Sequence, residues 1–231
     1  MGKLTPDRAG RMDFNPAIIP VWVLAFLMAV VFHEWAHGMV ARRLGDDTAS
    51  SMGRLTLNPL AHIDPIGTIA LPVVMMLTGA PFLFGWAKPV PVAFGRLRNP
   101  RRDMVLVALA GPAMNLVLAF ASAAVLSVLL RMPGGEGAAT GLQVAEPLKL
   151  LCEKSIGLNV VLAVFNLIPI PPLDGGRVAV GLLPRELAYR LAGLEPWGFL
   201  IIMALLATHV LDHLIGPVAN LVFGVIAAIF G

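Results

Sequence analysis

The chain has 231 residues, of which 58% are hydrophobic and 13% are charged, and its mean hydropathy is +0.82. Soluble domains carry about 25% charged residues, so this composition argues against a soluble protein and indicates an integral membrane protein. The net charge of +3 gives no reason to expect a nucleic-acid partner, and the single cysteine, Cys152, excludes an intrachain disulfide and a multi-cysteine metal site.

The first predicted helix covers about residues 17–44 and is expected to cross the membrane. Pro20 lies in its first turn, where proline is tolerated, and Gly45 is a typical stop. The polar segment 1–16 precedes this run, and no small-x-small cleavage site closes a short apolar region. We therefore expect the first span to be retained rather than removed as a signal peptide.

Two segments that follow, 53–58 and 90–94, alternate in polarity and predict short strands. The apolar segment 66–87 between them is interrupted by proline and glycine, and Lys and Arg flank it on both sides. Because Lys and Arg mark the cytoplasmic side of a membrane, both ends of this segment are expected there. The sequence therefore predicts a re-entrant segment, whose broken backbone must be covered by protein.

The rest of the chain predicts further helices, at about 103–131, 148–168, 176–192 (amphipathic), 197–212 and 216–230. The loop 132–147 contains no Lys or Arg, which favours the outer side, so the helix at 148–168 returns to the cytoplasmic face. By parity the N-terminus is expected outside. The predicted fold is an all-α polytopic membrane protein with short membrane-associated β-strands and a re-entrant segment.

Residues 33–37 read His-Glu-Trp-Ala-His inside the first predicted span. Residues i and i+4 share a helical face, so His33 and His37 can bind one metal ion, and Glu34 can act as general base on a water there. Histidine and glutamate are costly within a membrane and are functional there by default. A polar cluster packed between helices is the alternative interpretation.

A catalytic zinc takes three protein ligands and a water, so a third ligand is required. The candidates are His62, Asp64, Asp174 and the pair His209/His213. The first two lie among turn-forming residues, where capping or turn hydrogen bonds are expected. The histidine pair has Val210 in place of a base and is expected to make helix-end contacts.

Asp174 lies in a different setting, because it follows a helix that prolines must end and precedes two glycines. Glycine lets the backbone approach its neighbours closely. We also expect Asp174 to lie at a depth similar to that of the two histidines, near the cytoplasmic side.

Three motifs in this order, "HEWAH", "AGPAMN" (110–115) and "FNLIPIPPLDGGR" (165–177), resemble the site-2 protease family of intramembrane zinc metalloproteases. The resemblance covers about residues 17–190. It implies that His33, His37 and Asp174 bind one Zn²⁺ per chain and that Glu34 activates water. It also implies substrate contacts from Asn115 and Asn166, although an interhelical hydrogen bond is the alternative for Asn115.

The resemblance implies hydrolysis of peptide bonds within or near transmembrane segments of membrane protein substrates, such as single-span proteins or signal-peptide remnants. Residues 1–231 are expected to form one integral membrane protease domain, with a core at 17–190 and C-terminal apolar helices at 197–230. No PDZ-like or CBS-like domain is apparent. The expected location is a prokaryotic cell membrane, with the active site toward the cytoplasm. The predicted strands resemble the family's membrane-associated β-structure, which could hold an extended substrate.

Two other functions compete with this interpretation. A membrane metal-ion transporter or channel could use His33, His37 and Asp174, because intramembrane histidine and aspartate can mark an ion path. Such a site has no need for Glu34 directly after the first histidine. A non-hydrolytic scaffold is disfavoured, because the complete set of three ligands and a base is present.

Overall fold

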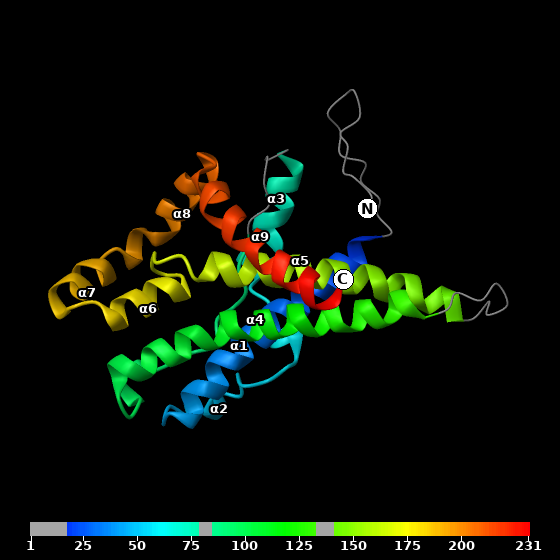
Figure 1. The fold of residues 1–231 in the computed structure, drawn as a ribbon. Coiled ribbons are helices and arrows are strands. Elements are labelled where there is room, and N and C mark those ends of the chain that lie inside the picture. Colours follow the sequence, from blue (N-terminus) through cyan, green and yellow to red (C-terminus); the bar gives the residue numbers. More distant parts are fainter. Residues whose placement is uncertain (1–17, 79–84, 133–140) are drawn as a thin grey trace.

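The computed structural model describes residues 18–78, 85–132 and 141–231, and these form a helical fold (Figure 1). The predicted N-terminal segment 1–16 and residues 133–140 of the predicted outer loop 132–147 lie outside the described residues, whereas residues 141–147 of that loop are helical and begin α5. The helices are α1 (Ile19–Arg43), α2 (Thr48–Ser51), α3 (Leu71–Leu77), α4 (Pro100–Arg131), α5 (Gly141–Asn166), α6 (Asp174–Leu182), α7 (Arg185–Ala192), α8 (Gly198–Ala207) and α9 (Val210–Phe230). Single helical turns occur at Pro59–His62, Pro65–Ala70, Phe94–Arg96 and Glu195–Trp197.

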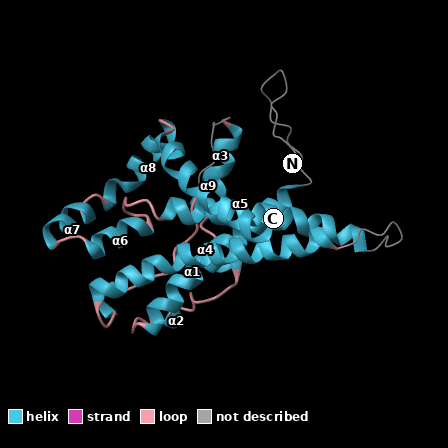
Figure 2. Cartoon of the chain, in the orientation of Figure 1, coloured by secondary structure: helices cyan, strands magenta, loops and turns pink. Residues whose placement is uncertain are grey.

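The predicted strands at 53–58 and 90–94 are wrong, because the described residues contain helices and loops but no strand (Figure 2). The segment around Val90 is held by side chains instead of by a strand ladder. Pro89 and Pro91 have no N–H to donate to a ladder. The Arg54 guanidinium donates to the carbonyl oxygens of Lys88 and Pro89, at 3.0 and 3.1 Å.

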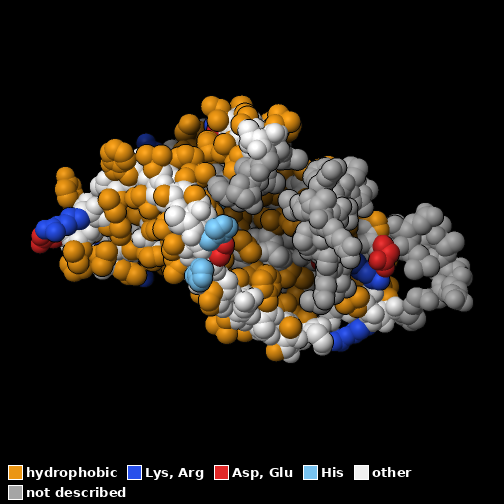
Figure 3. Space-filling model, turned by 90° about the horizontal axis from the view of Figure 1, so that it is seen from above, with side chains coloured by type: hydrophobic (Ala, Val, Ile, Leu, Met, Phe, Trp, Pro, Cys, Tyr) orange, Lys and Arg blue, Asp and Glu red, His pale blue; other side chains and the backbone are white. Residues whose placement is uncertain are grey.

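Within the described residues, four helical segments are long and apolar enough to cross a membrane, by length and composition: Ile19–Arg43, Pro100–Arg131, Arg185–Ala207 and Val210–Phe230. Hydrophobic side chains cover most of the described surface that Figure 3 shows. These features indicate an integral membrane protein. The predicted re-entrant segment 66–87 is helical over Pro65–Leu77, and residues 79–84 are not described, so its path relative to a membrane stays a prediction.

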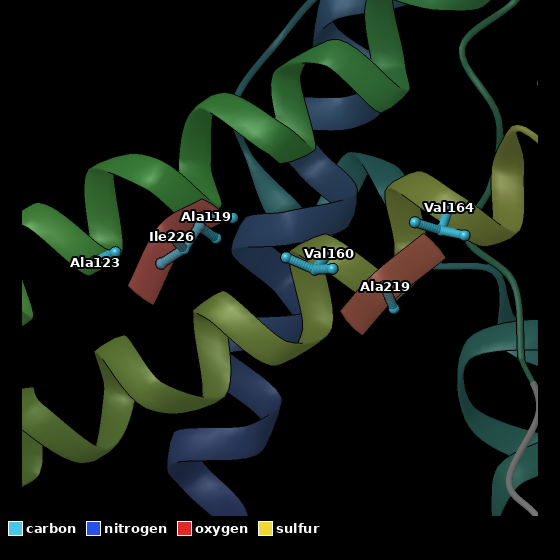
Figure 4. Packing of buried hydrophobic residues seen from close by; sticks show 6 residues of the cluster. All are labelled: Ala119, Ala123, Val160, Val164, Ala219 and Ile226. Atoms are coloured by element: carbon cyan, nitrogen blue, oxygen red, sulfur yellow. The ribbon is translucent and has the colours of Figure 1, made fainter. Parts of the chain in front are cut away.

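Helices α1, α4 and α5 pack against one another, and α9 packs against α4 and α5 (Figure 1). A buried cluster between α4, α5 and α9 is drawn in Figure 4; it consists of Ala119, Ala123, Val160, Val164, Ala219 and Ile226. Three of these six residues are alanines, and small side chains let helix backbones approach closely where lipid removes much of the hydrophobic driving force. The result is a closely packed helical frame that carries the site.

The predicted amphipathic stretch 176–192 forms two helices, α6 and α7, rather than one. Pro184 separates them, and proline disfavours helical geometry in the residue before it. Leu183 is accordingly extended, with φ −67° and ψ 154°. Helix α6 packs against α4, where Arg101 Nε donates to the carbonyl oxygen of Gly181 at 2.9 Å and the guanidinium also bonds the Leu183 carbonyl.

Asp46, just after α1, is buried and joins this end of the helix to the segment that follows Val90. Its carboxylate accepts hydrogen bonds from the Thr48 N–H at 3.0 Å, the Thr48 hydroxyl at 2.5 Å and the Ala93 N–H at 2.7 Å. Burial alone would raise the pKa of Asp46, but these hydrogen bonds and the charge of Arg96 hold it below its ordinary value. The ionised carboxylate therefore stabilises the folded state.

Replacing Asp46 with asparagine is expected to destabilise the protein by about 1–3 kcal/mol at neutral pH, because an amide cannot accept all three hydrogen bonds. A lowered folded-state pKa adds stability above the ordinary value of about 3.9, and this is lost as the pH falls through the lower folded-state pKa. The gap between variant and wild type should therefore shrink below about pH 4. Thermal unfolding in detergent across the pH range measures this gap.

The neighbouring aspartate is the matched control for this measurement. Asp47 is exposed and pairs with Arg96 at 2.9 Å on the surface. Exposed pairs contribute little to stability, so Asp47→Asn should unfold close to wild type at every pH. An Asp46→Asn variant as stable as Asp47→Asn at neutral pH would contradict the assigned role.

Candidate active site

Three buried side chains from two distant segments meet at one point in the described structure. His33 and His37 lie on α1, and Asp174 is the first residue of α6. The Nε2 atoms of the two histidines are 3.0 Å apart, and Asp174 Oδ2 lies 3.1 Å from His33 Nε2 and 3.2 Å from His37 Nε2. Ligands about 2.0–2.1 Å from a tetrahedral zinc are about 3.3 Å apart, so this spacing suits one ion.

The far side of each histidine ring shows which nitrogen carries the proton. His37 Nδ1 lies 2.7 Å from the Val107 carbonyl oxygen, which can only accept, and His33 Nδ1 lies 2.5 Å from Asn115 Oδ1. Both rings therefore donate from Nδ1, which in the neutral imidazole leaves the lone pair of Nε2 facing Asp174.

The two Nε2 atoms and Asp174 Oδ2 are arranged as a metal ion would need them. Asp174 Oδ2 is buried and has no hydrogen-bond partner among the described residues. Two lone pairs and a carboxylate oxygen repel one another in a buried setting unless a positive charge lies between them. The donor set, its spacing and this orphaned oxygen all fit a zinc ion.

Glycines allow the three candidate ligand atoms to come together. A Cβ at Gly111 of α4 would overlap His37 Nε2 and would lie 2.6 Å from His33 Cε1. A Cβ at Gly175 would overlap the Leu167 carbonyl, and one at Gly176 would overlap the backbone at Pro171. The glycine of "AGPAMN" thus makes room for the histidines, and the glycines after Asp174 let the chain turn tightly into α6.

Glu34 follows His33 on α1 and lines the same cavity as that histidine. Its Oε2 accepts a hydrogen bond from the Val90 N–H at 2.7 Å. The cavity has a volume of about 300 Å³ and includes His33 and Glu34 in its wall. Its other lining residues are mostly apolar or aromatic and include Phe26, Val30, Trp86, Phe165 and Phe199. A carboxylate in this position can take a proton from a water at the centre.

The two asparagines of the predicted site occupy different environments. Asn166 lines the cavity, and its Nδ2 donates to the Leu162 carbonyl at 3.0 Å, so its substrate role stays a prediction with suitable geometry. Asn115 is fully buried and uses both amide N–H groups within the protein. This geometry favours the interhelical alternative for Asn115.

The remaining ligand candidates lie outside the His33–His37–Asp174 cluster. His62 donates from Nε2 to the Thr56 carbonyl at 2.9 Å, and Asp64 caps the turn Pro65–Ala70 through the N–H groups of Ile66 and Gly67. The exposed pair His209/His213 makes local contacts at the start of α9, to Asp212 and to the backbone. Turn, capping and helix-end contacts are the roles that the sequence favoured for these residues.

Sequence reasoning missed Asn159, a fully buried residue of α5 whose Oδ1 accepts from Asn115 Nδ2 at 2.7 Å. A signal was present. Asn159 lies in a run without charged residues, four positions after Ser155 and seven before Asn166. The three polar side chains therefore share one helical face. A polar stripe inside an apolar helix indicates contacts with other helices or with a site.

The fold and the cluster define a membrane protein with a buried His-His-Asp centre beside a glutamate. The sequence model of Peptidase family M50 matches residues 21–157. "Putative zinc metalloprotease YwhC" of Bacillus subtilis (strain 168) is 38% identical over 88% of this chain and 88% of its own length. "Putative zinc metalloprotease Rip2" of Mycolicibacterium smegmatis is 34% identical over 83% of this chain and 68% of its own. No solved structure matches the chain.

The chain therefore belongs to peptidase family M50, the site-2 proteases, and is a zinc metalloprotease. The family consists of intramembrane enzymes, which agrees with the four apolar helices. The predicted family resemblance is confirmed.

Proposed function

We propose that this protein hydrolyses peptide bonds within or near the transmembrane segments of membrane protein substrates. His33, His37 and Asp174 hold one zinc ion, and Glu34 is the general base. One observation carries this proposal: the three candidate ligand atoms lie within 4.8 Å of one another, and Glu34 lies at the same cavity as His33.

Bound zinc supplies Lewis-acid polarisation of the scissile carbonyl and lowers the pKa of a water at the site toward about 7. The Glu34 carboxylate accepts the proton of the attacking water and passes it to the departing amine. The Val90 N–H holds one oxygen of Glu34 and so limits the rotation of the carboxylate. Asn166, which lines the cavity, is placed to contact the substrate backbone.

The apolar and aromatic cavity wall suits a substrate segment that enters from lipid. A substrate helix must unwind locally before its backbone reaches the histidines, because helical hydrogen bonds occupy its carbonyl groups. Helix-weak residues near the cleavage point, such as glycine, should therefore favour cleavage. We place the site toward the cytoplasmic side of a prokaryotic membrane, since basic residues concentrate around 88–102.

Reconstitution into liposomes separates this function from metal transport. The purified protein is supplied with a single-span peptide substrate, and cleavage products and zinc flux are measured in the same vesicles. Cleavage without flux supports the protease, whereas flux without cleavage supports the transporter that the same three ligands could serve. Mass spectrometry of membrane proteins from cells with active and inactive enzyme then identifies the natural substrates.

Asp174→Asn is expected to lower zinc affinity by more than about 100-fold, since changes to groups that merely support metal ligands already cost about 10–100-fold. The substitution keeps the shape of the side chain and removes its charge. Zinc affinity is measured by competition with a chelating indicator. Asp212→Asn is the control, because Asp212 is exposed and pairs with His209 away from the cluster. Equal zinc affinities in the two variants would exclude Asp174 as a ligand.

A further inference from the structure

A continuous chain of hydrogen bonds runs from the His33 ring through the interface of α1, α4 and α5. His33 Nδ1 contacts Asn115 Oδ1 at 2.5 Å, and Asn115 Nδ2 contacts Asn159 Oδ1 at 2.7 Å. Asn159 Nδ2 contacts the Ser155 carbonyl at 2.8 Å and the Ser155 hydroxyl at 3.1 Å. The chain ends at Ser122, whose hydroxyl lies 2.8 Å from that of Ser155.

The backbone carbonyls of Ala29 and Ser155 determine which group donates in each hydrogen bond that links Asn159, Asn115 and His33. The Ser155 carbonyl can only accept, so Asn159 must turn its NH₂ group toward it and its oxygen toward Asn115. The Ala29 carbonyl, 3.1 Å from Asn115 Nδ2, likewise can only accept. Asn115 must therefore present its oxygen to His33, and the His33 proton must be on Nδ1.

The opposite orientation is excluded by the same contacts. Rotating the Asn115 amide by half a turn would place its oxygen against the oxygens of both Ala29 and Asn159. Without Asn159, only the Ala29 contact would oppose that rotation, and one N–H of a fully buried amide would lose its partner. Asn159 thus contributes one of the two contacts that decide which nitrogen of His33 carries a lone pair.

We propose that Asn159 is a positioning residue for the metal centre. It acts through Asn115 to keep the His33 proton on Nδ1, so that Nε2 faces Asp174 with its lone pair available to a metal ion. This inference rests on the proposed role of His33 as a zinc ligand. A purely structural role, in which Asn159 only joins α4 to α5, would leave the histidine and its metal affinity unchanged.

The test compares Asn159→Leu with Ser122→Ala in the full chain. Both variants remove a hydrogen bond between α4 and α5, but only the first removes a contact to Asn115. Asn159→Leu should lower zinc affinity by about 10–100-fold, the range for groups that orient metal-binding histidines. Ser122→Ala should bind zinc within about threefold of wild type, because the amides of Asn115 and Asn159 keep their contacts to the Ala29 and Ser155 carbonyls.

Nitrogen-15 spectra of histidine-labelled protein without metal give a second readout. Wild type and Ser122→Ala should show His33 protonated at Nδ1 alone, whereas Asn159→Leu should show both tautomers. Unchanged zinc affinity and a single His33 tautomer in Asn159→Leu would overturn the proposal. If leucine prevents folding, Asn159→Ala removes the same amide and is judged by the same two results.

The conservative variant Asn159→Asp tests whether a similar side chain restores zinc affinity. Burial favours the protonated form of an aspartic acid, which offers an oxygen to Asn115 and an O–H to the Ser155 carbonyl. Asn159→Asp should therefore bind zinc within about tenfold of wild type and more tightly than Asn159→Leu. An affinity as low as that of Asn159→Leu would count against the proposal. Because these measurements need no substrate, an absence of cleavage would overturn the proposed function and leave this inference standing.

Discussion

Replacing Glu34 with glutamine is expected to slow peptide-bond cleavage by at least about 10²–10⁴-fold, the usual contribution of a general base, and to leave zinc bound. Glutamine has nearly the same shape, and its carbonyl oxygen can still accept the Val90 N–H. It cannot take a proton from water at neutral pH. Zinc should remain, because Glu34 is not one of the three proposed metal ligands.

Two measurements made together test this prediction. Cleavage of a single-span substrate in detergent gives the rate, and metal analysis of the same sample gives the zinc content. Glu153→Gln is the control, since Glu153 is exposed on α5 and outside the residues that line the cavity. Cleavage by Glu34→Gln at the wild-type rate would refute the proposed chemistry, and loss of zinc would show that Glu34 is needed to hold the metal.

Gly111→Ala is expected to weaken zinc binding and cleavage about 100-fold, although alanine is otherwise the better helix former. The added methyl group would occupy the space of the two histidine rings. Overpacking of this kind costs about 1–3 kcal/mol, and 1.4 kcal/mol corresponds to a factor of ten in affinity. The substitution should lower zinc affinity rather than the stability of α4, because His33 and His37 are the side chains that must move.

Gly157→Ala is the matched control. Gly157 lies inside α5, and a Cβ added there would meet no atom within 4 Å. The control should keep zinc affinity and gain up to about 1 kcal/mol of stability from helix propensity. Competition titrations and thermal unfolding of both variants distinguish the effects. If Gly111→Ala binds zinc as tightly as Gly157→Ala, the histidine rings accommodate the added methyl group without loss of metal affinity, and the prediction is wrong.

The sequence was sufficient for the parts of the site that depend on one helix or on a rigid turn. The spacing of His33 and His37 places both on one face, whatever the surroundings. The prolines before Asp174 and the glycines after it force a break and a tight return, which the structure contains. Their meeting point could be inferred from family resemblance but not from spacing, because it depends on how α1, α4 and α6 pack.

The failed strand prediction and the open role of Asn115 have a common physical cause, namely tertiary contacts that sequence patterns do not reveal. The residues around Val90 alternate like a strand, yet their polar backbone groups bond to Arg54, Glu34 and Asp46. The motif left two roles open for Asn115, and its full burial against His33 favours the interhelical one. In both cases a side chain far away in the sequence took the hydrogen bond.

The wide separation of His37 and Asp174 along the chain has a consequence for biosynthesis. A ribosome delivers the histidine pair early and the aspartate only after α4 and α5 have emerged. An ion held by two imidazoles alone lacks the third donor that a catalytic zinc requires. With the proposed ligand set, a complete zinc site forms only after the helices assemble, and the nascent enzyme is expected to stay inert until its fold is complete.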